Sequence, residues 1–168
     1  MIMFVHLAPE KALASIRRSG LRPARHASNG RELGVFAMPV LPNFLITHQW
    51  LRELKRGGQR TFWAVYFRLP AARPVLVGHF GRPHHALPAH AACALIRAAA
   101  DPLGYEVLIP GRIERSALHR LKPLPQTVGW RYRPDIREAP YCACPVCARP
   151  GTIKSRRKWE RWQAAGTV

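Results

Sequence analysis

Residues 4–21 read FVHLAPEKALASIRRSGL. The first four residues, Phe4–Leu7, form an apolar run that predicts a short buried strand. A helix is expected to follow, because Pro9 and Glu10 suit the first turn of a helix and Gly20 suits its end. The stretch therefore predicts a strand, a tight turn and a helix that stops at a glycine.

The same alternation of strands and helices continues toward residue 133. Runs rich in β-branched and aromatic residues predict strands at Gly34–Val40, Thr61–Leu69, Val75–Phe80, Tyr105–Ile109 and Thr127–Tyr132. Apolar periodicity and end signals predict helices at 43–55, at Ala89–Ala100 and, for one or two turns, at Glu114–Leu121, with loops at 22–31 and Gly81–Pro88. The pattern predicts an α+β domain at residues 1–133 and a small Cys-rich C-terminal appendage at residues 134–168.

Charge is the extreme feature of the composition. The chain has 27 Lys and Arg against 9 acidic residues, a formal net charge of +18. Arg-rich composition bias explains part of this excess, and the remainder favours contact with a polyanion such as nucleic acid or nucleotide phosphates. With 48% hydrophobic residues the chain also has enough apolar material for a core.

No membrane partner is expected from the sequence. No apolar run approaches the roughly 18 residues of a membrane helix, and the N-terminal residues lack the cationic start of a secretory signal. A cytoplasmic protein is the expectation.

Three residues have types and positions that suit a binding cleft. His6 lies on the first strand and Phe36 on the second, and each residue taken singly is more often a packed core residue. Glu106 lies in GYEVLIP, residues 104–110, among residues typical of a buried strand. Because an unpaired buried carboxylate is costly, proteins keep one mainly where it is paired or used, unless the strand edge faces solvent.

Taken in order, these segments resemble the ADP-ribosyltransferase superfamily. The resemblance is to the histidine–tyrosine–glutamate branch, which includes the poly-ADP-ribose polymerases and the DNA-modifying toxins. It covers residues 3–122 and rests on FVH at 4–6, SGL at 19–21, GVFAM at 34–38 and GYEVLIP at 104–110. It implies a split β-sheet core with flanking helices that binds NAD⁺.

The resemblance also implies a role for each matched residue. His6 would bond the adenosine-side ribose, the Leu7 backbone would hold the nicotinamide carboxamide, and Phe36 would stack on the nicotinamide ring. Glu106 would bind the nicotinamide ribose and stabilise the positive charge that forms as the glycosidic bond breaks. The same carboxylate could deprotonate an acceptor. His6 and Glu106 are therefore the expected catalytic residues.

Two positions depart from the family pattern. The family tyrosine is Phe36 here, which keeps the stacking ring and loses a hydroxyl. The family supplies a second aromatic residue from the following helix, for which this chain offers Phe44, His48 or Trp50. Basic residues of the loop, Arg22, Arg25 or Arg31, have the guanidinium geometry to cover the pyrophosphate.

The C-terminal appendage has its own candidate chemistry. Cys142, Cys144 and Cys147 supply three closely spaced thiolates, which favour a structural zinc site rather than a disulfide framework. The fourth ligand would be Cys93, His84 or His119; a reduced thiol cluster is the alternative. The basic tail at 149–161, with two interleaved tryptophans, is a candidate nucleic-acid contact.

The sequence therefore favours an NAD⁺-dependent ADP-ribosyltransferase with nucleic acid, or less readily protein, as its acceptor. An RNA 2′-phosphotransferase or an NAD⁺ glycohydrolase on the same fold is the nearest alternative. A zinc-stabilised nucleic-acid-binding module without turnover is the alternative from another class.

Overall fold

The computed structural model describes residues 1–25 and 33–128, and these residues mix strands and short helices as expected. The strands are β1 (Ile2–Pro9), β2 (Ala24–Arg25), β3 (Leu33–Pro39), β4 (Phe62–Leu69), β5 (Pro74–His79), β6 (His85–Pro88), β7 (Tyr105–Pro110) and β8 (Leu118–Pro123). The helices are η1 (Glu10–Ala12), α1 (Leu13–Ser19), α2 (Phe44–Thr47), α3 (Leu51–Leu54), η2 (Lys55–Gly57), α4 (Ala89–Ala98) and η3 (Arg115–Ala117).

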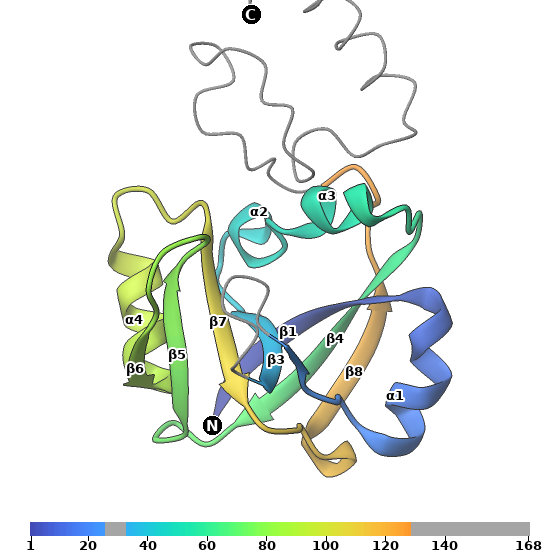
Figure 1. Ribbon diagram of the computed structural model, residues 1–168, viewed down its shortest axis with the longest axis horizontal. Coiled ribbons are helices and arrows are strands. Elements are labelled where there is room, and N and C mark those ends of the chain that lie inside the picture. Colours follow the sequence, from blue (N-terminus) through green and yellow to red (C-terminus); the bar gives the residue numbers. More distant parts are fainter. Residues whose placement is uncertain (26–32, 129–168) are drawn as a thin grey trace, which may run out of the picture. The chain divides into compact units, whose positions relative to one another are not determined.

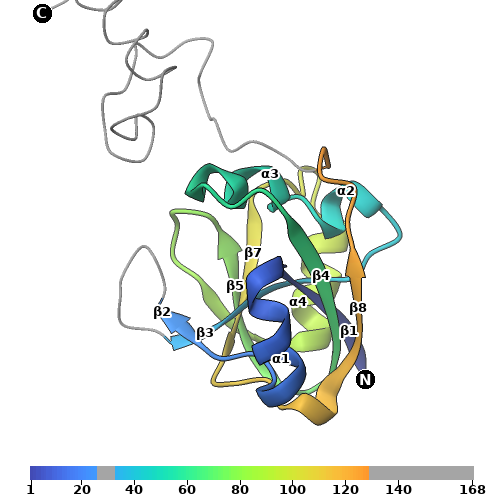
Figure 2. The same cartoon turned by 90° about the vertical axis from the view of Figure 1, so that its right-hand side faces the viewer.

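The strands form one antiparallel sheet in the order β6-β5-β7-β3-β1-β4-β8, with β2 paired to the start of β3 (Figure 1). Helix α4 packs on β5 and β6 near one end of the sheet. Helix α1 lies near β4 and β8, toward the other end, and Figure 2 shows it in front of the strands. The core fills the space between these helices and the sheet, with Phe4, Phe67, Ile96 and Ile109 among its buried members.

The N-terminal stretch folds as predicted, and Gly20 explains how it ends. Gly20 has φ 76° and ψ −165°, a conformation that side-chain-bearing residues avoid. A Cβ atom at this position would lie 2.1 Å from the Ile113 carbonyl oxygen. Leu21 then pairs with Ile113 in an isolated bridge. The glycine therefore lets the end of α1 approach the segment that follows β7.

Strands β1 and β3 separate after a short contact. Their register contains only Phe4↔Pro39 and Val5↔Met38. Beyond this point β1 continues to pair with β4 as far as Pro9↔Phe62. The preceding part of β3, Gly34–Ala37, pairs with β7 instead. The sheet therefore opens between two of its central strands.

Five expectations need correction. The loop expected at 81–88 contains the edge strand β6, which the sequence does not predict because its residues are mostly exposed and do not alternate. The loop expected at 22–31 contains the two-residue strand β2. The helix expected at 43–55 is divided into α2, α3 and η2, and its break lies at a buried polar run, Thr47–Gln49. The strand expected at Thr127–Tyr132 begins in a turn at Thr127, and residues 129–132 lie outside the described residues.

The fifth correction concerns Glu114–Leu121, for which the sequence predicts a helix. Only Arg115–Ala117 forms a 3-10 turn, and Leu118–Pro123 is strand β8. Leu118 pairs with Phe67 and Leu121 with Val65, because the register shifts by one residue between them. This β-bulge puts two leucines three residues apart on one face of a strand, which imitates the spacing of a helix.

In the described ranges, 1–25 and 33–128, no helix is long and apolar enough to cross a membrane. The expected boundary between the domain and the appendage, at residues 133 and 134, lies outside these ranges.

Candidate functional site

His6 lies where β1 and β3 separate. Its Nδ1 atom is 2.7 Å from the carbonyl oxygen of Phe36, and because a carbonyl only accepts, Nδ1 donates this hydrogen bond. Burial lowers the pKa of His6, an effect larger than the opposing one of the Phe36 bond. The ring is therefore neutral at pH 7, and its Nε2 atom is a hydrogen-bond acceptor.

This bond replaces the next rung of the β1–β3 ladder. If the register of Val5↔Met38 continued, Leu7 would pair with Phe36. The Phe36 carbonyl oxygen instead accepts a hydrogen bond from the His6 imidazole. The hydrogen bond of the His6 side chain thus takes the place of backbone pairing at the point where β1 and β3 separate.

The peptide groups of Leu7 face this opening. Along an antiparallel strand, the N–H and C=O of one residue point to the same side, and the side alternates from residue to residue. The Met3 carbonyl accepts from the Val40 N–H, so Met3 and, by alternation, Val5 and Leu7 direct their peptide groups toward β3. Leu7 therefore presents one donor and one acceptor where β3 has turned away.

Phe36 and Glu106 project from the same face of the sheet. Phe36 pairs with Leu108, so their side chains share a face, and Glu106 lies two residues before Leu108 on β7. Such diagonal neighbours on paired strands are about 7–8 Å apart. An aromatic ring and a carboxylate therefore lie side by side, next to the strand that carries His6.

His84 covers the Glu106 carboxylate. Its Nε2 atom is 3.2 Å from Oε1 of Glu106, and Glu106 is only 9% exposed. Gly78, which pairs with Glu106, makes this arrangement possible: a Cβ at Gly78 would lie 2.9 Å from the Pro83 carbonyl oxygen and 3.1 Å from the His84 Cα. Burial raises the pKa of Glu106 to about 7.

Gln49 and Trp50 fix the start of the strand that carries Glu106. The Gln49 side chain, which is fully buried, donates to the Pro102 carbonyl at 3.1 Å and accepts from the Gly104 N–H at 2.7 Å. The Trp50 indole N–H donates to the Tyr105 carbonyl at 2.8 Å. Three bonds thus hold the backbone immediately before Glu106.

Phe44, the first residue of α2, and His48, which follows the last residue of α2, differ in accessibility. His48 is 2% exposed, and both of its ring nitrogens are bonded, Nδ1 to the Phe44 carbonyl and Nε2 to the Tyr66 hydroxyl. Phe44 is 47% exposed, and its ring centroid lies 4.2 Å from that of His48. Phe44 therefore has exposed surface that a ligand could contact, whereas the buried His48 ring packs against the Phe44 ring.

The basic candidates lie near the start of β3. Arg25 belongs to β2, where it pairs with Leu33, three residues before Phe36. Arg22 is exposed and lies between the Leu21 bridge and β2. Arg31 lies outside the described residues.

The predicted zinc ligands Cys142, Cys144 and Cys147 also lie outside the described residues. The three candidate fourth ligands are dispersed: Cys93 is buried on α4, His84 contacts Glu106, and His119 is exposed in the β8 bulge. In residues 1–25 and 33–128, no group of three or more His, Cys, Asp or Glu side chains is placed to hold a metal ion.

Sequence reasoning missed the roles of Gln49 and His84. A signal for Gln49 exists in the run Thr47-His48-Gln49, three polar residues within an otherwise apolar helical segment. His84 has no comparable local signal, because its contact with Glu106 depends on how the loop after β5 folds back over Gly78.

Compared with known protein families, with curated proteins and with solved structures, the chain gives no match.

Proposed function

We propose that the chain is an NAD⁺-dependent ADP-ribosyltransferase of the histidine–tyrosine–glutamate type, with a split-sheet core built around β1, β3 and β7. The observation that carries the proposal is the His6–Phe36 bond, which takes the place of a ladder rung and leaves the Leu7 peptide groups facing the opening. One donor and one acceptor, close together and fixed by a strand, match the two polar groups of a carboxamide.

The neighbouring side chains suit the rest of the ligand. Phe36 would stack on the nicotinamide ring, and Phe44 or Trp50 would supply a second aromatic contact. The Nε2 atom of neutral His6 can accept a bond from a ribose hydroxyl. Arg22 and Arg25, near the start of β3, would cover the pyrophosphate, because guanidinium groups match phosphate geometry.

Glu106 would act on the bond that breaks. The C1′–N bond of the nicotinamide ribose breaks, nicotinamide leaves with the electron pair, and C1′ becomes a cationic oxocarbenium. A fixed carboxylate beside C1′ stabilises that charge. A lone pair of the acceptor then forms the new bond to C1′, and the acceptor's proton passes to Glu106. For this, ribose must take the place of His84 against the carboxylate.

The charge of +18 favours nucleic acid over protein as the acceptor. The test is incubation with adenine-labelled NAD⁺ and, separately, DNA, RNA and a protein mixture. Label is expected on a macromolecule, and Glu106→Gln should lower the rate at least ~100-fold, the scale of removing one electrostatic catalytic group. Glu10→Gln, an exposed acid, is the matched control and should leave the rate unchanged.

The outcomes separate the candidate functions. Free nicotinamide without a labelled macromolecule would indicate an NAD⁺ glycohydrolase. Failure of the wild-type chain to consume NAD⁺ would contradict the proposal and favour a binding module.

A second experiment tests carboxamide binding directly. Leu7→Pro removes the N–H that faces the opening and leaves the β4 side of β1 intact, since proline is tolerated where a strand's N–H faces away from its partner. NAD⁺ affinity, measured by calorimetry, should fall in Leu7→Pro and persist in Leu7→Ala. Equal affinity in two folded variants would contradict the assigned role of Leu7.

A further inference from the structure

A hollow of about 520 Å³ opens where β4 ends and where the segment after β7 leads into η3. We call it the basal hollow. Its lining carries six polar or charged side chains: Arg68, Arg73, Arg112, Glu114, Ser116 and His119. None of these residues belongs to the candidate site described above.

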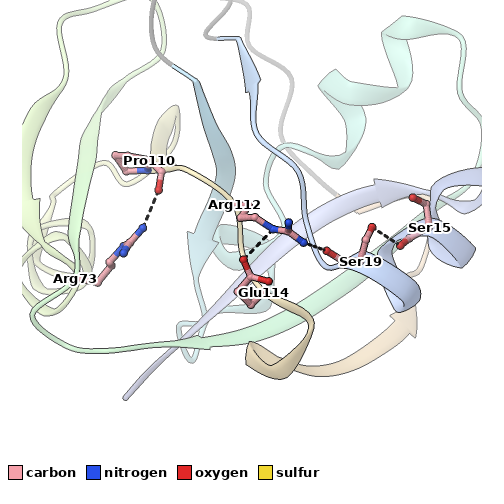
Figure 3. Close-up of polar contacts among 6 residues, drawn as sticks. All are labelled: Ser15, Ser19, Arg73, Pro110, Arg112 and Glu114. Carbon is pink, nitrogen blue, oxygen red and sulfur yellow. Dashed lines mark hydrogen bonds and ion pairs between the residues drawn. The ribbon is translucent and has the colours of Figure 1, made fainter.

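Two of the arginines are held in place by the fold. Arg73 donates to the Pro110 carbonyl at 2.9 Å. Arg112 donates to the Ser19 carbonyl at 2.7 Å, and its Nε lies 2.9 Å from Glu114 (Figure 3). A guanidinium has five N–H donors, so each group retains donors for a ligand after these bonds. Fixing the side chains in advance lowers the entropic cost of binding.

The charge in the basal hollow is strongly positive. The lining contains three arginines and one carboxylate, that of Glu114, which is already paired with Arg112. Arg68 is exposed on β4. The hollow therefore attracts anions, and guanidinium groups bind phosphate with better geometry than an ammonium does.

The arrangement favours a phosphate polymer over one phosphate ion. In Figure 3 the guanidinium groups of Arg73 and Arg112 lie apart, on either side of the segment from Pro110 to Glu114, and do not converge on one point. Separate cationic contacts along a surface suit the repeating charges of a nucleic-acid backbone.

We propose that the basal hollow binds the phosphates of a nucleic-acid strand. Its role as the docking site of the acceptor rests on the proposed function, whereas the binding itself does not. Strand β7 links the hollow to the candidate site: Glu106 and Pro110 are four residues apart, about 13 Å along an extended strand. A strand held at the hollow by a few phosphates therefore has nucleotides within reach of that region.

The test is binding of a fluorescently labelled single-stranded DNA, followed by anisotropy across a salt series without NAD⁺. The triple variant Arg68→Gln, Arg73→Gln, Arg112→Gln should weaken binding about 10-fold or more and lower the salt slope by about two, since each phosphate contact contributes about 0.7 to that slope. The control triple variant, Arg52→Gln, Arg60→Gln, Arg97→Gln, removes the same charge from exposed positions elsewhere and should lose less than about 3-fold.

Arg68→Gln guards against a folding defect, because the Arg68 side chain is exposed on β4. This single variant should keep the melting temperature and still lower the salt slope by about 0.7. Equal binding by the two triple variants would overturn the proposal. So would competition by inorganic phosphate as effective as by unlabelled DNA at equal phosphate concentration, which would indicate a single-ion site.

The binding assay also separates this proposal from the enzymatic one. Specific loss of binding in the first triple variant, together with no NAD⁺ consumption by the wild type, would support the basal hollow and contradict the transferase. Transfer of label from NAD⁺ to a macromolecule, together with equal DNA binding by both triple variants, would support the transferase and contradict the basal hollow.

Discussion

Nε2 of His84 lies 3.2 Å from Oε1 of Glu106, in a pair that the fold largely shields from water. The histidine reaches this position because a loop passes over Gly78 at a distance that no side chain at residue 78 would permit. His84 therefore lies directly against the Glu106 carboxylate and restricts its access to a ligand.

The buried carboxylate should make stability depend on pH. Burial raises the pKa of Glu106 from 4.5 to about 7, so the folded state binds a proton that the unfolded state has lost. The free energy of unfolding should therefore decrease as pH rises through this interval, by about 3 kcal/mol at most.

Glu106→Gln should remove this dependence and be more stable than wild type at about pH 8, with little difference at about pH 4. Urea unfolding at both pH values measures the effect, with Glu10→Gln as the control. Identical pH dependence in wild type and Glu106→Gln would show that the carboxylate is already charged in the fold.

Two replacements of Phe36 should differ in their effect on NAD⁺ binding. Phe36→Ala removes the stacking ring and should raise the KM for NAD⁺ about 3- to 10-fold, the equivalent of one aromatic stacking contact. Phe36→Tyr adds a hydroxyl and keeps the aromatic ring, so it should keep both the fold and NAD⁺ turnover. Steady-state kinetics with NAD⁺ test both, and an unchanged KM in Phe36→Ala would exclude Phe36 from the ligand contact.

Gln49 should position Glu106 through the backbone. Gln49→Ala leaves the Pro102 carbonyl and the Gly104 N–H without their buried partner, which should cost about 2–4 kcal/mol of stability. It should also lower kcat more than it raises KM, because it displaces the carboxylate and not the residues of β1 and β3 that are proposed to bind NAD⁺. Gln59→Ala, between η2 and β4, is the control. A pure stability loss with unchanged kcat would contradict the positioning role.

Gly20 should tolerate no side chain. Gly20→Ala puts a Cβ against the Ile113 carbonyl at a backbone conformation that only glycine adopts readily, so a loss of about 2–4 kcal/mol is expected. Gly57→Ala meets no atom within 4 Å and should change stability by less than about 0.5 kcal/mol. Thermal unfolding compares the two, and equal melting temperatures would refute the steric argument.

The cysteine cluster carries a prediction that is independent of the fold described above. Purified protein should contain about one zinc ion per chain, consistent with the four-ligand habit of structural zinc. Chelation or Cys144→Ser should remove the metal, which elemental analysis measures. Absence of metal in protein purified without chelator would favour a reduced thiol cluster.

The sequence predicted the strands that carry the candidate site because each is a local apolar run bounded by turn residues. His6, Phe36 and Glu106 lie on three adjacent strands, β1, β3 and β7, and this adjacency is a long-range property that no local pattern contains. The β8 bulge misled the prediction, since its leucines repeat at a helical spacing. The sequence did not predict that His84 contacts Glu106 or that Gln49 bonds Gly104, because each residue meets its partner only through tertiary folding.

The two end strands of the sheet bear on self-association. An uncovered strand edge is a template for pairing with another copy and for aggregation. At one end, β6 is four residues long and finishes at Pro88, which cannot extend a ladder of hydrogen bonds. At the other end, β8 carries Arg120 and Lys122, so two approaching copies would repel one another. Within the residues that the structure describes, the sheet does not close on itself. Short length, proline and like charge thus protect its two end strands against edge-to-edge polymerisation.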